Sequence, residues 1–190
     1  MIGECLTTAC IGGMAGLNAI AVTIGPGAFT GVRIGLAAAR GLGLAAALPV
    51  IGVTTFEAIA ADAPEPETRT GALMVALESR RDDVFVQIFR GATGLAPCSL
   101  APGALADFVT STLGPDHVMV AGNAAARMMP LLTDRHINAE LSQANPEPET
   151  SRIAALAALR WRPGERPPVP GPLYLRKPDA VPGLGALRPS

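Results

Sequence analysis

The stretch from residue 19 to residue 48 constrains the fold more than any other part of the chain. It joins a short apolar run rich in β-branched residues, a glycine-rich turn and a long series of small residues. The run at 19–24 predicts a buried strand, because the breakers Gly25-Pro26-Gly27 stop it. We expect Thr30 to cap a helix that begins at Gly31 and continues to Pro49, over about 18 residues. This stretch therefore predicts a strand, a tight turn and a helix in direct succession.

One face of the predicted helix carries no side chain larger than a methyl group. Gly31, Gly35, Ala39, Gly43 and Ala47 recur at every fourth position, which places them on one face. Glycine inside a helix costs roughly 0.5 to 1 kcal/mol relative to alanine, so these glycines indicate a close approach of another backbone. Two alternatives stay open. Either a partner helix packs here, from this chain or another, or the helix is simply shaped to fit its own sheet.

The glycine turn before this helix fits neither of two common nucleotide-binding motifs. Its spacing is one residue too long for the dinucleotide fingerprint, and the next acidic residue is Glu57. No Gly-Lys-Ser/Thr sequence follows, so the turn is not a Walker A loop. What remains is a helix N-terminus, whose free backbone N–H groups attract a phosphate in any fold. Gly25, Gly27 and Thr30 are therefore candidate phosphate-binding residues, and a plain turn is the alternative.

The rest of the chain alternates strands and helices, which predicts an α/β fold. Thr54 and Glu57 have the spacing of a capping box at the start of a helix. The proline-rich and acidic segment 62–68 predicts a boundary between a first lobe, residues 1–63, and a second lobe with an extended tail, residues 64–190. Beyond the first strand and helix, we expect strands at 50–53, 71–77, 84–89, 93–100, 118–121 and 137–141, and helices at 55–61, 103–113, 124–132 and from residue 151. The helix at 124–132 is expected to end near Pro130.

Charge and reactive side chains limit the classes of function. A formal net charge of −1 argues against a surface that grips nucleic acid unaided. Cys5, Cys10 and Cys98 form no Cys-x-x-Cys pair, so neither a disulfide framework nor a zinc site is indicated. His117 and His136 stand in no recognisable catalytic or metal-binding motif. We predict no catalytic residue and no metal site. With no signal sequence or membrane span recognised, we predict a cytoplasmic location.

Several motifs resemble those of the bacterial TsaB (YeaZ) family, the dimerisation subunit of the machinery that makes threonylcarbamoyladenosine in tRNA. The most specific is the glycine turn with its small-residue helix. The others are a Pro-Val-Ile-Gly-Val-Thr-Thr-Phe-Glu-Ala segment, a strand–turn–strand entry to the second lobe, a Gly-Asn-Ala-Ala turn and a Pro-Leu-Tyr-Leu-Arg segment. They lie at residues 24–48, 49–58, 77–87, 122–125 and 172–176.

The chain departs from the family pattern at two places. The entry to the second lobe usually reads Asp-Ala-Arg, and this chain has Glu78-Ser79-Arg80. Family members begin with a strand, a hairpin and a helix, and residues 1–17 show neither a helical stripe nor an alternation. We therefore expect no regular element there, a first lobe truncated at its N-terminus, and a strand at 19–24 with one unpaired edge.

The resemblance implies a fold, a role and a set of partners. The fold is the two-lobed, actin-like ATPase (ribonuclease H-like) fold. The role is that of a non-catalytic subunit in the complex that forms N6-threonylcarbamoyladenosine at position 37 of ANN-decoding tRNAs. A TsaD-type subunit is expected to catalyse the transfer and a TsaE-type subunit to act as the ATPase, so ATP and metal belong to those partners and none to this chain. A homodimer is also consistent with the resemblance, and tRNA is contacted only through the complex.

The expected contact with the catalytic subunit is the small-residue helix. A hydrolase of the M22 glycoprotease type is the main alternative, because the family is grouped with those peptidases, but the missing metal ligands argue against it. A non-functional family fragment is a third alternative, suggested by the N-terminal segment. The residues predicted at the partner interface are Gly31, Val32, Gly35, Leu36, Ala39 and Gly43.

Overall fold

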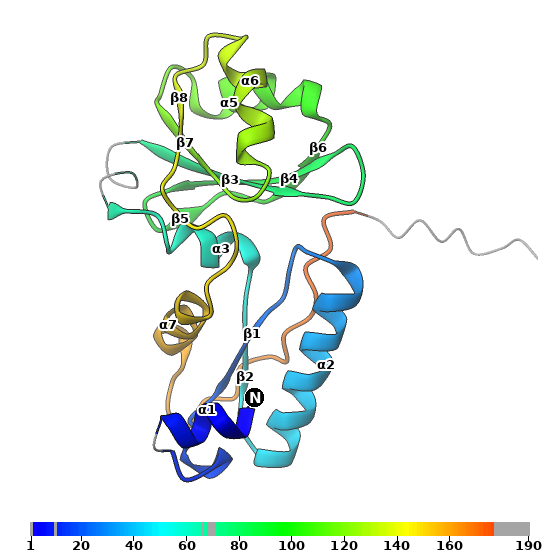
Figure 1. Cartoon of the computed structure of the whole chain (residues 1–190), viewed down its shortest axis with the longest axis vertical. Helices are drawn as coiled ribbons and strands as arrows, with labels where there is room; N and C mark the ends of the chain where they lie inside the picture. The colour runs from blue at the N-terminus through cyan, green and yellow to red at the C-terminus, as the bar shows by residue number, and fades with distance from the viewer. Residues whose placement is uncertain (1, 10, 66, 68–70, 177–190) are drawn as a thin grey trace, which may run out of the picture.

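Two sheets organise the protein (Figure 1). The structure is a computed structural model, and it describes residues 2–9, 11–65, 67 and 71–176. We call the part built on the smaller sheet the two-stranded lobe and the part built on the larger sheet the six-stranded lobe. The predicted behaviour of residues 177–190 as an extended tail lies outside the described residues.

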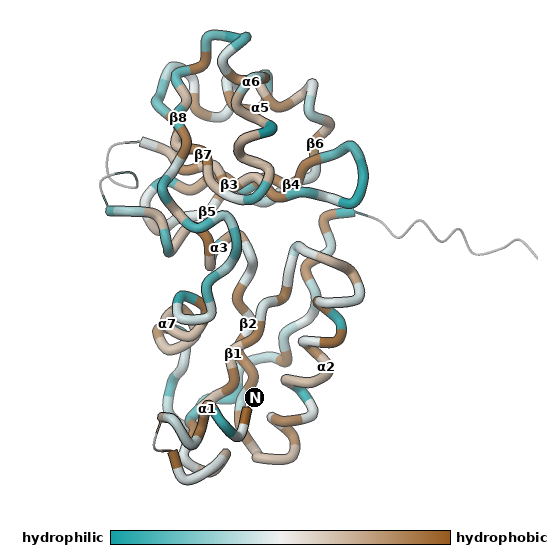
Figure 2. The backbone as a smooth tube through the Cα atoms, in the orientation of Figure 1, coloured by the Kyte–Doolittle hydropathy of each residue, from teal (hydrophilic) through white to brown (hydrophobic). Residues whose placement is uncertain are grey.

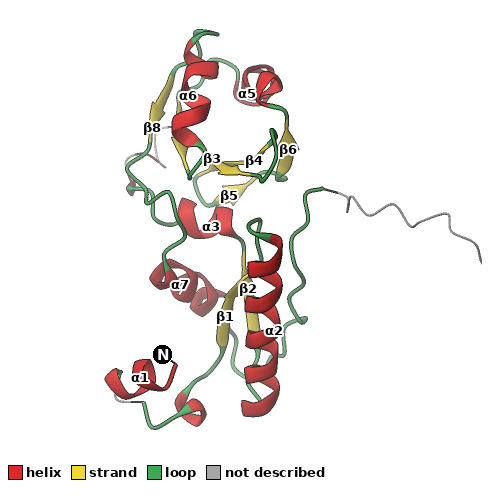
Figure 3. Cartoon of the chain, turned by 45° about the vertical axis from the view of Figure 1, so that its right-hand side comes forward, coloured by secondary structure: helices red, strands yellow, loops and turns green. Residues whose placement is uncertain are grey.

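The two-stranded lobe is a parallel pair of strands between two helices. Strand β1 (Ile20–Thr23) pairs with β2 (Val50–Val53). Helix α2 (Phe29–Ala46) covers one face and α7 (Thr150–Arg160) the other, as Figure 3 shows. Hydrophobic residues run along both strands between these helices (Figure 2). The side chains alternate as a strand requires: Ile20, Val22 and Val50 approach α2, whereas Ala21, Ile51 and Val53 pack toward α7.

The six-stranded lobe is built around an antiparallel hairpin. Strands β3 (Ala72–Glu78) and β4 (Val84–Arg90) pair over seven residues, which confirms the hairpin predicted from the sequence. On the other side of β3 the sheet continues with two parallel strands, β7 (Val118–Ala121) and β8 (Ala139–Leu141). Beyond β4, the single strand expected at 93–100 is two short strands, β5 (Thr93–Gly94) and β6 (Cys98–Leu100).

Helices cover both faces of the larger sheet. Helices α5 (Leu105–Leu113) and α6 (Ala125–Thr133) pack on the face that carries Met74, while the short α3 (Thr55–Ala60) packs on the face that carries Val75. A 3-10 turn at 102–104 precedes α5. Residues 72–77 of β3 are therefore all buried, because each face of the strand is covered.

The predicted capping box at the start of α3 is confirmed. Thr54 Oγ1 accepts a hydrogen bond from the backbone N–H of Glu57 at 3.1 Å, and the Glu57 carboxylate accepts one from the N–H of Thr54 at 2.8 Å. Burial raises the pKa of Glu57, but hydrogen bonds from Thr54 and Arg160 outweigh it and lower this pKa below its ordinary value. The box holds α3 at the point where the chain passes from one lobe to the other.

Three boundaries differ from the sequence-based expectations. Helix α2 begins at Phe29 with Ala28 at its N-cap, so Thr30 lies in the first turn and does not cap the helix. Helix α6 continues through Pro130 to Thr133, because Met128 and Leu132 on either side of the proline are fully buried and hold the helix together. Ile2–Thr8 form a helix, α1, where no regular element was expected. No residue of α1 is buried.

The predicted lobe boundary after residue 63 stays a prediction. The chain crosses between the lobes again after that point. After β8 the chain returns to the two-stranded lobe, where α7 packs against β1 and β2. Residues 170–173 then run beside β1 and β2. Among the described residues, no helix is both long enough and apolar enough to cross a bilayer.

Candidate functional site

A pocket of about 500 Å³ opens between the two lobes. The turn before α2 and the first turns of that helix form one wall, through Pro26–Phe29, Val32 and Arg33. The loop after β3 forms the opposite wall, through residues 78–81, together with Phe85 of β4. Residues 173–176 complete the lining. The pocket lies beyond the carboxyl ends of β1 and β3, where α/β sheets commonly place their ligands.

The three candidate phosphate-binding residues are only partly brought together. Gly27 lines the pocket, whereas Gly25 is buried beneath the turn and Thr30 is exposed outside the pocket lining. Gly25 has a φ of 97°, and its carbonyl accepts a hydrogen bond from the N–H of Thr55. The glycine is therefore required by the backbone of the turn, and phosphate binding stays a prediction.

From Gly35 to Gly43, the stripe of small residues on α2 faces the protein's own sheet. Leu36, Ala39 and Gly43 are buried. A Cβ atom at Gly43 would come within 2.6 Å of Val50 Cγ2 and 2.9 Å of the Leu48 carbonyl oxygen. Gly43 is therefore small because a strand lies against it, which is the intrachain alternative left open by the sequence.

The other predicted interface residues are less deeply placed. Gly31 is exposed, Val32 is half-buried in the pocket wall, and a Cβ at Gly35 would lie 4.0 Å from Val22. That the six residues contact a partner protein stays a prediction. The three buried residues would meet a partner only if α2 moved away from its sheet.

The opposite face of α2 is exposed and almost entirely apolar. Ile34 is 64% exposed and Leu44 is 87% exposed, and a Cβ at Gly41 would have nothing within 4 Å. An apolar helix face is normally buried against another element, so this face is a surface that lacks a partner within the described chain. We call it the α2 outer face, and its residues are Thr30, Ile34, Ala37, Ala38, Gly41, Leu44 and Ala45.

Sequence reasoning selected the small-residue stripe and missed the α2 outer face. The two faces have similar compositions, and the glycines at every fourth position drew attention to the buried one. The available signal was the absence of charged residues from the outer face, although Arg33 and Arg40 lie elsewhere on the same helix. A helix with an ordinary solvated surface carries polar residues there.

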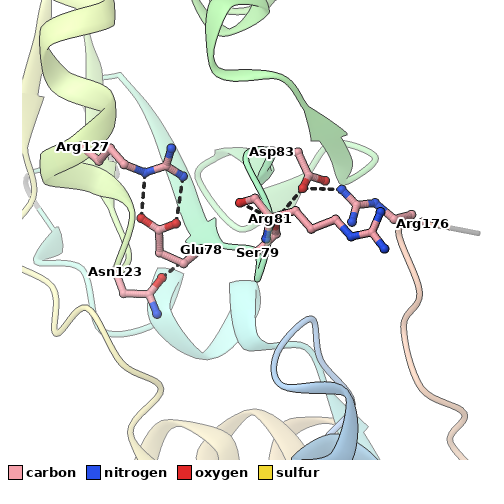
Figure 4. A network of polar contacts seen from close by, with 7 residues as sticks. All are labelled: Glu78, Ser79, Arg81, Asp83, Asn123, Arg127 and Arg176. Carbon is pink, nitrogen blue, oxygen red and sulfur yellow. Dashed lines mark hydrogen bonds and ion pairs between the residues drawn. The ribbon is translucent and has the colours of Figure 1, made fainter. Parts of the chain in front are cut away.

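Polar contacts at Glu78, the last residue of β3, and at Asp83 fix the shape of the loop between β3 and β4 (Figure 4). Glu78 accepts two hydrogen bonds from Arg127, both at 2.8 Å, and its backbone N–H donates to Asn123 Oδ1 at 2.9 Å. Asp83 accepts hydrogen bonds from Ser79 and Ser99 and pairs with Arg176. Burial raises the pKa of Asp83, but these three partners outweigh it and lower the pKa to about 2. These carboxylates are held by partners and do not simply face solvent.

The Gly122-Asn123 turn beside this loop depends on a glycine. Gly122 has a φ of 93°, and a Cβ there would lie 2.3 Å from the Ala76 carbonyl oxygen. Because that oxygen also accepts a hydrogen bond from Ala124 N, the turn is fixed against the end of β3. The close approach places Asn123 where it holds the backbone of Glu78.

The two histidines lie apart from the pocket lining. His117 Nε2 is buried without a hydrogen bond within the described structure and lies 3.7 Å from Glu140 Oε1. His136 is exposed, with a φ of 55°. Across the described ranges, no three His, Cys, Asp or Glu side chains gather as metal ligands. The predictions of no catalytic residue and no metal site stay predictions.

Comparisons with known proteins identify the family. The model of the family described as TsaD, tRNA N6-adenosine threonylcarbamoyltransferase, matches residues 1–96. A Mycobacterium tuberculosis protein described as uncharacterized is 34% identical over 172 residues, covering 89% of this chain and 69% of its own length. The tRNA threonylcarbamoyladenosine biosynthesis protein TsaB of Escherichia coli is 41% identical over 85 residues, covering 45% of this chain and 36% of its own.

The fold is shared with solved structures of the same group. YeaZ from Pseudomonas aeruginosa superposes with a TM-score of 0.73 at 25% sequence identity, covering 92% of this chain and 82% of that one. This likeness confirms the predicted α/β, actin-like fold class. Together with the sequence matches it also confirms the resemblance found in the motifs. The chain therefore belongs to the tRNA N6-adenosine threonylcarbamoyltransferase (TsaD) family and, within it, is a homologue of the TsaB (YeaZ) proteins.

Proposed function

We propose that this chain is a non-catalytic subunit of the complex that forms N6-threonylcarbamoyladenosine at position 37 of ANN-decoding tRNAs. Its relatives named TsaB support the pathway, because that name describes a protein of tRNA threonylcarbamoyladenosine biosynthesis. The catalytic step belongs to a TsaD-type partner in this proposal. The chain contributes the surface on which that partner is held.

The α2 outer face is the observation that carries the proposed partner contact. It extends along an 18-residue helix and exposes Ile34 and Leu44 to solvent. Exposed apolar patches of this kind mark sites of protein association. Small residues such as Ala38 and Gly41 let a second helix come close, so a helix of the catalytic subunit is the partner that fits this face. A second copy of the chain would use the same face in a homodimer.

Cofactors and the other partners are assigned to the assembled complex. We place ATP and metal on the TsaD-type and TsaE-type subunits, and tRNA contact on the complex as a whole. The formal net charge of −1 supports the last point, since a surface that binds tRNA alone needs an excess of basic side chains. Because the proposed substrate is tRNA, we also assign the complex to the cytoplasm.

Co-purification with the TsaD-type subunit of the same organism tests the proposed contact. Ile34→Asp places a charge at the centre of the α2 outer face, and we expect at least a tenfold loss of affinity, because the carboxylate would have to be desolvated in the contact. Leu159→Asp is the matched control. Leu159 is 72% exposed on α7 of the same lobe, so this variant should bind like the unmodified chain.

Two results would count against the contact. Equal affinity of the Ile34→Asp and unmodified chains, with both folded by circular dichroism, would remove the α2 outer face from the interface. An equal loss in both variants would show that exposed charges in this lobe weaken binding wherever they are placed. A separate assay measures threonylcarbamoyladenosine formation by the reconstituted complex with and without this chain. Activity of the isolated chain would overturn the non-catalytic role.

A further inference from the structure

Residues 170–176 form a C-terminal strap that touches both lobes. They follow α7 and run from the two-stranded lobe, past the end of β1, to the loop after β3 (Figure 1). Residues 173–176 of the strap also line the interlobe pocket. A segment placed in this way influences how far the two lobes can separate.

The strap is hydrogen-bonded to the two-stranded lobe at three points. The N–H of Leu173 donates to the Ile24 carbonyl at 2.7 Å, and Arg40 of α2 donates to the Pro170 carbonyl at 2.6 Å. Arg33 Nε donates to the Tyr174 hydroxyl at 2.8 Å. The Arg33 guanidinium also stacks on Phe29, 3.6 Å from the ring centroid. These contacts tie the strap to β1 and to α2.

The strap meets the six-stranded lobe through an ion pair and two leucines. Arg176 pairs with Asp83, which Ser79 and Ser99 hold in place on the loop and on β6. Leu173 and Leu175 pack against the apolar cluster under the larger sheet, which includes Leu77. The Asp83 side chain is only 13% exposed, so this contact is protected from solvent screening.

The covalent links between the lobes lie on the opposite side of the molecule. Residues 61–65 and residues 142–149 both lie near α3, and the strap crosses on the side of α2 (Figures 1 and 3). Asp62 joins these links, because it accepts hydrogen bonds from the N–H of Asn145 and from Arg152. Two bodies that are joined along one side can swing about it, and a tie on the far side limits that swing.

We propose that the C-terminal strap holds the interlobe pocket closed and that its release lets the two lobes swing apart about the side where α3 lies. This inference is independent of the partner contact proposed for the α2 outer face. It assigns a conformational role to Arg176, Asp83 and Tyr174. None of these residues needs to touch a reacting group for that role.

Breaking the ion pair on the six-stranded lobe tests the proposal. Asp83→Asn removes the charge that holds Arg176 and keeps the size of the side chain. We expect hydrogen exchange of the Leu173 amide, measured by NMR, to become about tenfold faster, because the strap opens more often. Asp107→Asn is the matched control, since it breaks the exposed pair with Arg135 and leaves the strap untouched.

The swing itself is measured by the distance between two spin labels. Ala47 at the end of α2 and Thr110 on α5 are exposed, and cysteines there would carry the labels in a chain whose own cysteines are replaced by serine. Dilution with unlabelled protein removes distances between copies. Asp83→Asn should broaden the distance distribution and shift its mean, and Asp107→Asn should leave the distribution unchanged.

Each outcome decides the proposal. A shifted label distance supports it, with or without faster exchange at Leu173, because the strap can leave the six-stranded lobe while Leu173 stays hydrogen-bonded to Ile24. Faster exchange with an unchanged distance overturns it, because the strap then leaves without freeing the lobes. If Asp83→Asn fails to fold, Arg176→Ala breaks the same ion pair from the side of the strap. Unchanged exchange and distance in a folded variant of either kind would also overturn the proposal.

Discussion

Strands β3 and β1 are the first parallel strands of their respective sheets, and they are buried to different degrees. Residues 72–77 of β3 are all buried, whereas every residue of β1 is only half-buried. β3 has paired neighbours on both edges. No strand within the described structure pairs with the second edge of β1. The six-stranded lobe therefore has its own core, while the two-stranded lobe depends on α2, α7 and the strap to bury its strands.

Truncating one core side chain in each lobe should give the largest difference in the free energy of unfolding between the two lobes. Met74→Ala empties a site at the centre of the larger core, and it should lower the free energy of unfolding by about 2–5 kcal/mol. Val22→Ala in β1 removes less buried surface and should cost about 1–2 kcal/mol. Urea unfolding of both variants measures this. Equal losses of unfolding free energy in the two variants would show that the smaller sheet is as well packed as the larger one.

Two glycines of α2 test how differently its inner and outer faces are packed in the two-stranded lobe. Gly43→Ala forces a methyl group against Val50 and the Leu48 carbonyl, and it should destabilise the protein by about 1–3 kcal/mol. Gly41→Ala adds the same group on the α2 outer face, where nothing lies within 4 Å, and it should stabilise by about 0.5–1 kcal/mol. Thermal unfolding separates the two. Opposite signs are expected, and the same sign for both would mean that α2 is rotated relative to its described position.

Lowering the pH tests the tie between the lobes. The pKa of Asp83 is about 2 in the folded protein and 3.8 as its ordinary value, so the unfolded chain binds the proton more readily. Ionised Asp83 therefore contributes up to about 2 kcal/mol to the free energy of unfolding. This contribution is fully present above about pH 4 and is lost as the pH falls toward 2. Urea unfolding between pH 5 and pH 2 follows it. In Asp83→Asn, the free energy of unfolding should no longer show this part of its pH dependence. If the variant retains it, another carboxylate is responsible.

A small effect is expected at the junction between the two lobes. Thr54→Ala removes the side-chain half of the capping box of α3 and should cost about 1 kcal/mol. Because Phe56 and Ile59 of α3 are fully buried beneath the larger sheet, the helix should stay in place. Far-UV circular dichroism and urea unfolding provide the check. A loss of several kcal/mol would mean that the cap, and not this packing, holds α3.

Much of the six-stranded lobe was predictable because its signals are local. The hairpin at β3 and β4, the strand β7 and the capping box at Thr54 follow from apolar runs, turns and spacings within a few residues. The end of α6 was not predictable from the sequence. Whether this helix continues past Pro130 depends on the burial of Met128 and Leu132 by distant segments. Helix α1 was missed because it buries no side chain.

The candidate site was predictable only in part. The glycine turn and α2 are local features, and the sequence located both. Which face of α2 meets the sheet could not be read from the helix alone, because both faces are apolar and contacts with Val22 and Val50 distinguish them. The strap was recognised as a short motif, but its partners Ile24 and Asp83 lie far away in the sequence.

Most elements, the α/β class and the family likeness follow from the sequence, because strand and helix periods, turn residues and motifs are properties of neighbouring residues. Only the tertiary structure decided that Gly43 faces inward, that Ile34 faces outward and that residues 170–176 join the two lobes. The physical reason is that these facts depend on contacts between residues far apart in the chain. A local pattern carries no record of such contacts until the chain has folded.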